Sequence, residues 1–304
     1  MEREHRRPRE RRLRERLRAL EAATAHDAEL KFASWPSAAP AQCDRNRGAL
    51  VETALAHAHP AGAPPMTHDG ELWCYDEFVI WPEFTSKYAE TSVAARSVEP
   101  DSDATQLYLD LETMGLARSH GIFMAGYLLP EPGGVRLLQE LAADPAEEFH
   151  LLARARARLV ARPRAITFNG RGFDFHALAR RLRFHALEPL PTSIEVIDLL
   201  PAARRCYKRR FADFRLSTLE RELLGCQRGA GDVPGSEAPL RYQDFQDSGR
   251  LERLAPILHH NRLDLCALVL LKQHLDRAVA LAQSAAAESD ASSKPTLLDA
   301  GSST

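Results

Sequence analysis

The sequence predicts an α/β domain on a mixed central sheet: three antiparallel strands, then parallel strands, with flanking helices and a helical C-terminal part. Two observations predict it. Three apolar, strand-like segments with short connections follow one another between residues 106 and 138. After them, helix-like and strand-like segments alternate up to residue 199. Closely connected strands pair as antiparallel hairpins, whereas strands separated by a helix pair in parallel, so this order gives a mixed sheet.

The individual elements follow from the pattern of apolar and turn-forming residues. The antiparallel strands are predicted at residues 106–110, 121–129 and 135–138, with Gly133-Gly134 as the turn before the third. The alternating part comprises a helix at 145–161, a buried strand at 165–168, a helix at 174–184 and a strand at 194–199. The C-terminal helices are predicted at 201–209, 216–225 and 250–276, the last with a break near Pro256.

One main domain with extensions at both ends is expected. Leu13, Leu17 and Leu20 stand at helical spacing among charged residues, which indicates an amphipathic helix. Residues 284–304 are rich in Ser, Ala and Asp, which indicates disorder. The expected organisation is a charged helical arm at 1–30, an irregular, linker-like segment at 31–69, a short β-containing extension packed on the core at 70–104, the main domain at 105–278 and a disordered tail at 284–304.

Composition places the chain in the globular class. Of its 304 residues, 44% are hydrophobic and 27% are charged, and the net charge of -2 does not by itself indicate a nucleic-acid-binding protein. No apolar run of membrane-spanning length and no secretory signal occur, so we expect no membrane contact and a cytoplasmic location. The five cysteines are scattered without a C-x-x-C pair, which argues against a disulfide framework or a zinc site.

Acidic residues at three separate places have the pattern of a cation site. Asp110 and Glu112 alternate on one predicted strand and therefore share a face. Asp174 stands where a predicted helix begins, and Asp264 lies within an apolar helical segment, where a buried charge is costly unless a cation offsets it. Taken alone, each has an ordinary explanation as a solvated strand end, a helix N-cap or an exposed polar stripe.

Taken together, these segments resemble the DEDD exonucleases of the ribonuclease-H-like superfamily, and in particular their YprB-like branch. The motifs are Asp110-Leu-Glu112-Thr-Met-Gly, Asn169-Gly-Arg-Gly-Phe173-Asp174 and His260-Asn261-Arg262-Leu-Asp264. Further similar stretches are Ile197-Asp198-Leu199-Leu200, Leu216-Ser217-Thr218-Leu219-Glu220 and Gly231-Asp232-Val233-Pro234-Gly235. The resemblance covers residues 105–276 and implies a ribonuclease-H-like fold for the main domain.

The resemblance implies a metal-dependent nuclease, and more narrowly a 3′–5′ exonuclease that hydrolyses phosphodiesters of single-stranded DNA or RNA. It implies that two Mg²⁺ or Mn²⁺ ions are ligated by Asp110, Glu112, Asp174 and Asp264. Hard divalent cations prefer carboxylate oxygens, and two of them about 4 Å apart can activate a water and stabilise a leaving oxygen.

A histidine before the last aspartate is expected to act as the general base, because its pKa lies near neutrality. Histidine-type relatives place it five residues before that aspartate, which is the position of His259. Tyrosine-type relatives place a tyrosine four residues before it, which is the position of His260. The spacing from Asn169 to Asp174 resembles the second group, which favours His260 and keeps His259 as the alternative.

The expected partner is nucleic acid, and no protein partner is indicated. The expected substrate contacts are Thr113, Asn169, Phe173, Asn261, Arg209 and Arg210. The two arginines belong to a basic cluster with interleaved aromatics at 204–215, which suits a phosphate backbone and stacked bases or, alternatively, a solvated helix face.

Two other functions stay open. One is a catalytically silent nucleic-acid-binding or scaffold module with the same fold, because fold does not guarantee activity. The presence of all four carboxylates weighs against it. The other is a metal-dependent endonuclease, which a substrate with blocked 3′ ends would distinguish from an exonuclease.

Overall fold

The computed structural model describes residues 66–80, 103–115, 120–229, 232–250 and 253–292. All of these belong to the second of the two units into which the chain divides, Asn46–Thr304. The charged arm expected at 1–30 and most of the linker-like segment expected at 31–69 lie outside the described residues.

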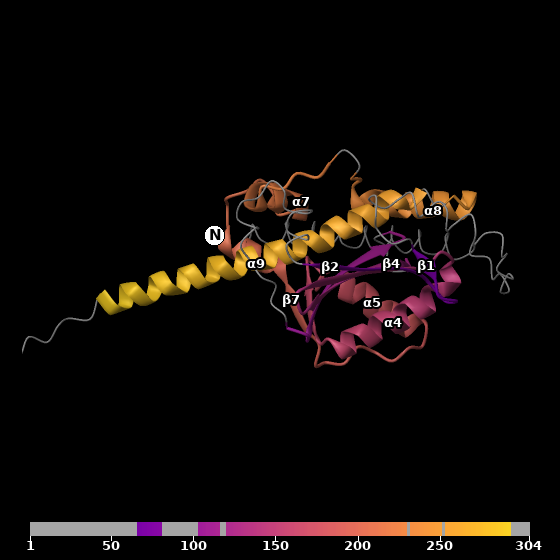
Figure 1. Ribbon diagram of the computed structural model, residues 1–304, viewed down its shortest axis with the longest axis horizontal. Helices are drawn as coiled ribbons and strands as arrows, with labels where there is room; N and C mark the ends of the chain where they lie inside the picture. Colours follow the sequence, from indigo (N-terminus) through magenta and orange to yellow (C-terminus); the bar gives the residue numbers. More distant parts are fainter. Residues whose placement is uncertain (1–65, 81–102, 116–119, 230–231, 251–252, 293–304) are drawn as a thin grey trace, which may run out of the picture. The chain divides into compact units, whose positions relative to one another are not determined.

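Among the described residues, a seven-stranded mixed sheet forms the centre of the domain (Figure 1). Its spatial order is β1-β2-β5-β4-β3-β6-β7. The strands are β1 (Thr67–His68), β2 (Trp73–Ile80), β3 (Gln106–Thr113), β4 (Ile122–Glu131), β5 (Gly134–Leu141), β6 (Arg164–Thr167) and β7 (Glu195–Asp198). Along this spatial order, every pair of neighbouring strands from β1 through β5 and β4 to β3 is antiparallel, whereas β6 pairs in parallel with both β3 and β7. The predicted fold class is confirmed.

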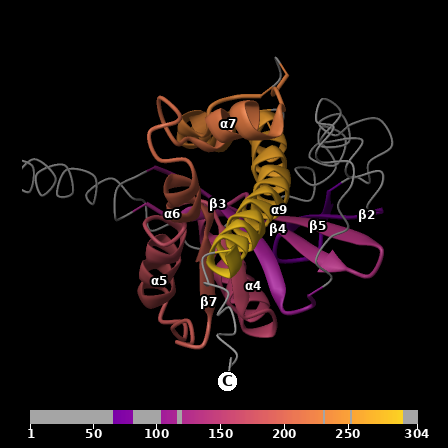
Figure 2. The ribbon, with the colours of Figure 1, turned by 90° about the vertical axis from the view of Figure 1, so that its left-hand side faces the viewer.

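Helices cover both faces of this sheet. They are α4 (Glu148–Ala161), α5 (Asp174–Phe184), α6 (Leu199–Cys206), α7 (Leu216–Leu219), α8 (Ala238–Ser248) and α9 (Ala255–Ser292). Single turns occur at η2 (Pro145–Glu147), η3 (Glu220–Leu224) and η4 (Gly235–Glu237). Figure 1 and Figure 2 show α4 and α5 against one face and α9 crossing the other. No helix in the described part of the chain is long and apolar enough to cross a membrane.

Alternation along β3 decides which helices each of its side chains meets. Leu109 and Leu111 belong to the core formed with α4 and α5, whereas Tyr108 belongs to the core formed with α9. Because successive strand residues point to opposite faces, Asp110 and Glu112 project to the α9 face. The strand thus presents a leucine face to one helical layer and a carboxylate pair to the other.

The first part of the expected extension at 70–104 joins the sheet itself. β2 pairs antiparallel with β5 from Trp73, opposite Leu141, to Ile80, opposite Gly134. β2 therefore adds a strand beyond the β5 edge of the sheet. Residues 81–102 lie outside the described part of the chain.

The helical C-terminal part differs from expectation in three places. Pro256 lies in the first turn of α9, where a proline is tolerated, so it begins the helix and does not break it. α9 also continues past residue 276 to Ser292, so residues 284–292 of the expected disordered tail are helical, and the alanines of this stretch are strong helix formers. The rest of that tail, 293–304, lies outside the described residues. α8 was not predicted at all, since its apolar residues are few.

Candidate active site

Four carboxylates from three separate elements approach one another. Asp110 and Glu112 come from β3, Asp174 is the first residue of α5, and Asp264 lies on α9. Burial raises the pKa of Asp110 well above its ordinary value, and repulsion from Asp264, Glu112 and Asp174 raises it further. Burial likewise raises the pKa of Glu112, together with the charges of Asp264 and Asp174. The structure therefore brings together the four acidic residues that the sequence singled out.

Asp174 is also buried, and burial is the main cause that raises its pKa to about 7. The turn that delivers it begins at Asn169, whose φ of 61° is left-handed. Asp198 stabilises this turn by accepting hydrogen bonds from the backbone amides of Asn169 (2.8 Å) and Arg171 (3.2 Å). The N-cap of α5 is Phe173, so Asp174 does not serve as the helix cap.

A row of residues across three strands positions Asp110. Asp110, Gly126 and Gln139 lie opposite one another on β3, β4 and β5. Asn261 on α9 spans this row, because its Nδ2 donates to Asp110 Oδ2 (2.8 Å) and its Oδ1 accepts from Gln139 Nε2 (2.9 Å). A Cβ on Gly126 would lie 2.0 Å from Asn261 Oδ1, so glycine is needed for α9 to approach this closely.

Asn261 therefore has a role other than the expected contact with substrate. Its side chain is 0% exposed, and its amide is occupied by Asp110 and Gln139. A substrate cannot reach a fully enclosed side chain, so we correct the expectation: Asn261 orients Asp110 and attaches α9 to the sheet.

The fourth carboxylate, Asp264, is bound by an arginine that the sequence did not point to. Arg228 Nη2 lies 2.5 Å from Asp264 Oδ1 and 2.6 Å from Glu220 Oε2, and Arg228 Nη1 lies 3.3 Å from Asp232 Oδ2. Burial, repulsion from Asp264 and repulsion from Asp232 together raise the pKa of Glu220 to about 7, despite the adjacent guanidinium. Glu220 and Asp232 belong to the further stretches that resemble the YprB-like branch. Nothing local in the sequence indicated that Arg228 pairs with them.

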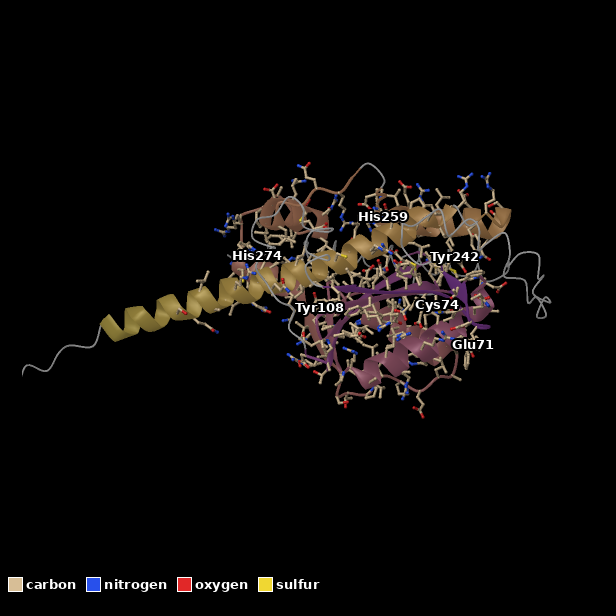
Figure 3. All side chains as sticks on the ribbon, in the orientation of Figure 1. Glu71, Cys74, Tyr108, Tyr242, His259 and His274 are labelled. Atoms are coloured by element: carbon tan, nitrogen blue, oxygen red, sulfur yellow. The ribbon has the colours of Figure 1, made fainter. Side chains whose placement is uncertain are left out.

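Of the two candidate histidines, His260 is the one that contacts this group. Its Nδ1 lies 2.8 Å from Asp232 Oδ1, and its Nε2 lies 3.6 Å from Asp264 Oδ2. A Cβ on Gly235 would lie 3.0 Å from His260 Nε2, so the segment after Asp232 packs closely on the ring. His259 is its neighbour on α9 (Figure 3), where burial and the positive charge of Arg262 lower its pKa.

The donor set fits Mg²⁺ or Mn²⁺, because these cations prefer carboxylate oxygens. As the side chains stand, no three Asp, Glu, His or Cys residues in the described ranges form a ready ligand group. The two findings are compatible. Carboxylates without a cation between them repel one another, and Arg228 engages one oxygen of Asp264. The residues fit a divalent cation chemically, although their present arrangement is not that of a ligand group.

The other expected substrate contacts lie at different distances from the carboxylates. In the turn before Asp174, Asn169 is exposed and Phe173 is partly exposed, whereas Thr113 is 7% exposed and donates to the carbonyl of Gly115. Arg209 and Arg210 are exposed beyond the end of α6. Arg210 is near His274, which is ten residues after Asp264 and so about 15 Å further along α9. These arginines can contact only a substrate that extends away from the carboxylates.

Comparison with known proteins agrees with this architecture. A family model described as the RNase_H superfamily matches residues 107–276, which is more than half of the chain. The chain belongs to the RNase H superfamily. It is 32% identical over 225 residues to the uncharacterized protein YprB of Bacillus subtilis (strain 168), covering 71% of this chain and 52% of that protein. The predicted YprB-like family is confirmed, and the chain spans about half the length of this relative.

A solved structure also matches part of the domain. It is the family B DNA polymerase from the hyperthermophilic archaeon Pyrobaculum calidifontis, with a TM-score of 0.43 and 13% sequence identity. The match covers 56% of this chain and 24% of the polymerase chain.

Proposed function

We propose that this protein is a divalent-cation-dependent nuclease, and specifically a 3′–5′ exonuclease that acts on single-stranded DNA or RNA. The observation that carries the proposal is the approach of Asp110, Glu112, Asp174 and Asp264 from three elements far apart in the sequence. Membership of the RNase H superfamily supports nuclease activity, and nucleases of this superfamily generally use divalent metals.

The four carboxylates would hold the cations at the end of β3, between α5 and α9. When bound there, divalent cations lower the pKa of a water molecule and stabilise the leaving oxygen of a phosphodiester. Asn261 keeps the Asp110 carboxylate oriented through the hydrogen bond to Oδ2. In the neutral His260 ring, Nδ1–H donates to Asp232, which leaves the lone pair of Nε2 beside Asp264 to take a proton from the attacking water.

A basic and aromatic surface beside α9 supports the proposal that the substrate is single-stranded. The Arg210 guanidinium lies 5.6 Å from the centre of the Tyr207 ring and 5.8 Å from that of Phe211. The Tyr207 hydroxyl and His274 Nε2 are 2.7 Å apart, which joins this aromatic group to α9. Among the described residues, no ion pair engages the surrounding exposed cations, which are Arg204, Arg205, Lys208, Arg209 and Arg210. Unpaired cations beside aromatic rings suit a phosphate backbone whose bases stack.

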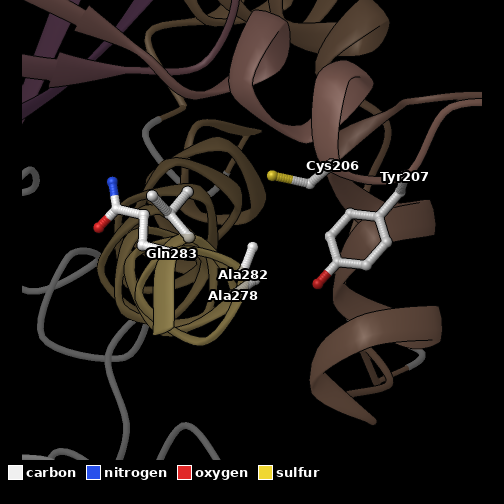
Figure 4. A pocket seen from close by; sticks show the side chains of 6 residues that line it. Cys206, Tyr207, Ala278, Ala282 and Gln283 are labelled. Carbon is white, nitrogen blue, oxygen red and sulfur yellow. The ribbon is translucent and has the colours of Figure 1, made fainter. Parts of the chain in front are cut away.

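A groove of about 390 Å³ separates the end of α6 from α9 next to this surface (Figure 4). Its lining is mostly apolar and consists of Cys206, Tyr207, Ala278, Val279, Ala282 and Gln283. An apolar groove next to exposed cations suits the faces of bases, whose phosphates the cations would contact. The groove therefore extends the surface on which we expect single-stranded nucleic acid to lie.

Digestion of end-labelled oligonucleotides tests the proposed activity. With Mg²⁺ or Mn²⁺, we expect 5′-labelled single strands to shorten progressively from the 3′ end. Asp110→Asn should reduce the rate at least about a thousandfold because it removes one cation ligand. Asp247→Asn, on the exposed face of α8, is the matched control and should retain full activity.

The same experiment separates the alternatives. Cleavage of circular single strands, or of strands with blocked 3′ ends, would indicate an endonuclease. Binding without turnover across several metals and substrates would indicate a silent binding module. Full activity of purified Asp110→Asn would end the proposal of a carboxylate-held metal site.

Fluorescence anisotropy with labelled single strands tests the surface beside α9. Tyr207→Ala removes a stacking ring and Arg210→Gln removes a phosphate contact, so each should weaken binding about tenfold. For Arg210→Gln, the salt dependence of the binding constant should also fall by about 0.7 in log–log slope per lost phosphate contact. The control is Arg183→Gln, because Arg183 is exposed on α5, which packs against the opposite face of the sheet. Unchanged affinity in both test variants would exclude this surface from the substrate path.

A further inference from the structure

One guanidinium, that of Arg228, is surrounded by acidic side chains at the edge of the candidate active site. Its side chain is 13% exposed, and it pairs with Asp264, Glu220 and Asp232. Asp264 Oδ1 meets Arg228 at 2.5 Å, whereas its Oδ2 lies 3.6 Å from His260 Nε2. A divalent cation at this carboxylate would need oxygen lone pairs that Arg228 now uses.

The other three carboxylates of the candidate site differ from Asp264 in that no cationic side chain pairs with them among the described residues. Among the described residues, Asp110, Glu112 and Asp174 have no ion-pair partner, although Asp110 accepts a hydrogen bond from Asn261. Positive charge is thus concentrated on the Asp264 side of the group. Two cations that approach one partly buried carboxylate repel each other strongly, because the effective dielectric constant there is far below that of water.

Arg228 can leave Asp264 without losing its other partners. Its Nε donates to Glu220 Oε2 at 2.7 Å and its Nη2 lies 2.6 Å from the same oxygen. Its Nη1 also lies 3.3 Å from Asp232 Oδ2. A guanidinium that keeps two carboxylates needs no new partner when it gives up a third. Loss of the pair with Asp264 therefore leaves the guanidinium beside two other carboxylates.

We propose, on the basis of the function proposed above, that Arg228 is the resident counter-ion of Asp264 and that a divalent cation displaces it from this carboxylate. Arg228 is then a positioning residue with two effects. It keeps Asp264 paired while the cation is absent, and it weakens cation affinity because the guanidinium competes for the same oxygen. Removing its charge should strengthen cation binding, which is the opposite of what loss of a merely structural ion pair would do.

Isothermal titration of Mn²⁺ into the full chain tests this competition. We expect Arg228→Gln to bind Mn²⁺ about tenfold more tightly than wild type, because a nearby positive charge is gone. Arg228→Lys keeps the charge and should remain close to wild type. Arg241→Gln is the matched control, since Arg241 lies on α8 and pairs with the partly exposed Glu237. This variant should leave Mn²⁺ affinity unchanged.

The outcomes distinguish this inference from the proposed function. If wild type binds Mn²⁺ and Arg228→Gln binds it equally or more weakly, the counter-ion role is wrong while the metal site stands. If neither wild type nor any variant binds Mn²⁺, the metal site itself is wrong and the inference falls with it. Tighter binding by Arg228→Gln alone supports the inference.

Arg228→Gln leaves Asp264 and Glu220 without their counter-charge and can therefore fail to fold. A measurement on the wild-type chain covers that case. The Nε–Hε NMR signal of Arg228, assigned by comparison with Arg228→Lys, should shift as Mg²⁺ is added to saturation. A signal that stays in place while Mg²⁺ binding is saturated would overturn the proposed displacement.

Discussion

Gly126 is the residue that lets α9 reach the carboxylates. It lies between Asp110 and Gln139 in the sheet and directly under Asn261. Since Asn261 binds both neighbours of Gly126 in the row, any side chain at this position would separate α9 from the strand that carries Asp110. The sequence contains no local signal for this glycine, because it occupies an ordinary position in an apolar strand.

Gly126→Ala should destabilise the domain by about 1–3 kcal/mol, the usual range for an overpacked core. The new Cβ would lie 2.0 Å from Asn261 Oδ1 and 2.8 Å from Leu265 Cδ1. Chemical denaturation measures the effect. Gly229→Ala, whose Cβ would meet nothing within 4 Å, is the control and should change stability little. Equal stability of the two variants would show that α9 does not press on β4 as described.

At the scale of elements, Glu148 at the start of α4 joins three parts of the fold. Its carboxylate accepts hydrogen bonds from Arg181 of α5 and from the backbone amide of Ile122 (2.7 Å), and it lies 2.9 Å from His185 Nε2. Burial alone would raise the pKa of Glu148, but the bonds from Arg181, His185 and Ile122 outweigh it and keep the pKa below the ordinary 4.5. The layer of α4 and α5 is thereby attached to β4.

Glu148→Gln should lower the free energy of unfolding at pH 7 by about 3 kcal/mol, because one partner of a buried ion pair is lost. A lowered carboxyl pKa contributes stability that is complete above pH 4.5 and is lost as pH falls through the folded-state value. The difference between variant and wild type should therefore shrink below pH 4.5 in urea titrations. Glu237→Gln, which removes a more exposed pair with Arg241, should cost under about 1 kcal/mol. A difference that stays constant down to pH 3 would contradict this role.

The elements were predictable where periodicity is strong. The three hairpin strands and the following alternation of helix and strand were expected from sequence, and the sheet has that order. α8 was missed because a short helix with few apolar residues has the same composition as a polar loop. The extension of α9 to Ser292 was missed because its Ser, Ala and Asp content also indicates disorder. β2 was expected near the core, but only long-range pairing places it on β5.

At the scale of the whole molecule, cation binding should be linked to folding stability, because the four carboxylates come together only in the folded chain. A ligand that binds only the folded state stabilises it by about 2.7 kcal/mol at a hundred times its Kd. For a domain of this size, this corresponds to a rise in Tm of about 5–10 °C. Thermal unfolding with Mn²⁺ and then with excess EDTA measures the shift and its reversal. A Tm that does not respond to any divalent cation would contradict the metal site.

The sequence by itself determined the order of the three hairpin strands and of the helices and strands that alternate after them, the family, and the shared face of β3 on which Asp110 and Glu112 lie. These properties depend on local periodicity, which a chain carries in neighbouring residues. Only the tertiary structure decided that Arg228 pairs with Asp264, that His260 and not His259 contacts that aspartate, and that Asn261 of α9 is enclosed against the sheet. Each depends on which distant side chain fills a given space, and packing between remote segments leaves no periodic trace in the sequence.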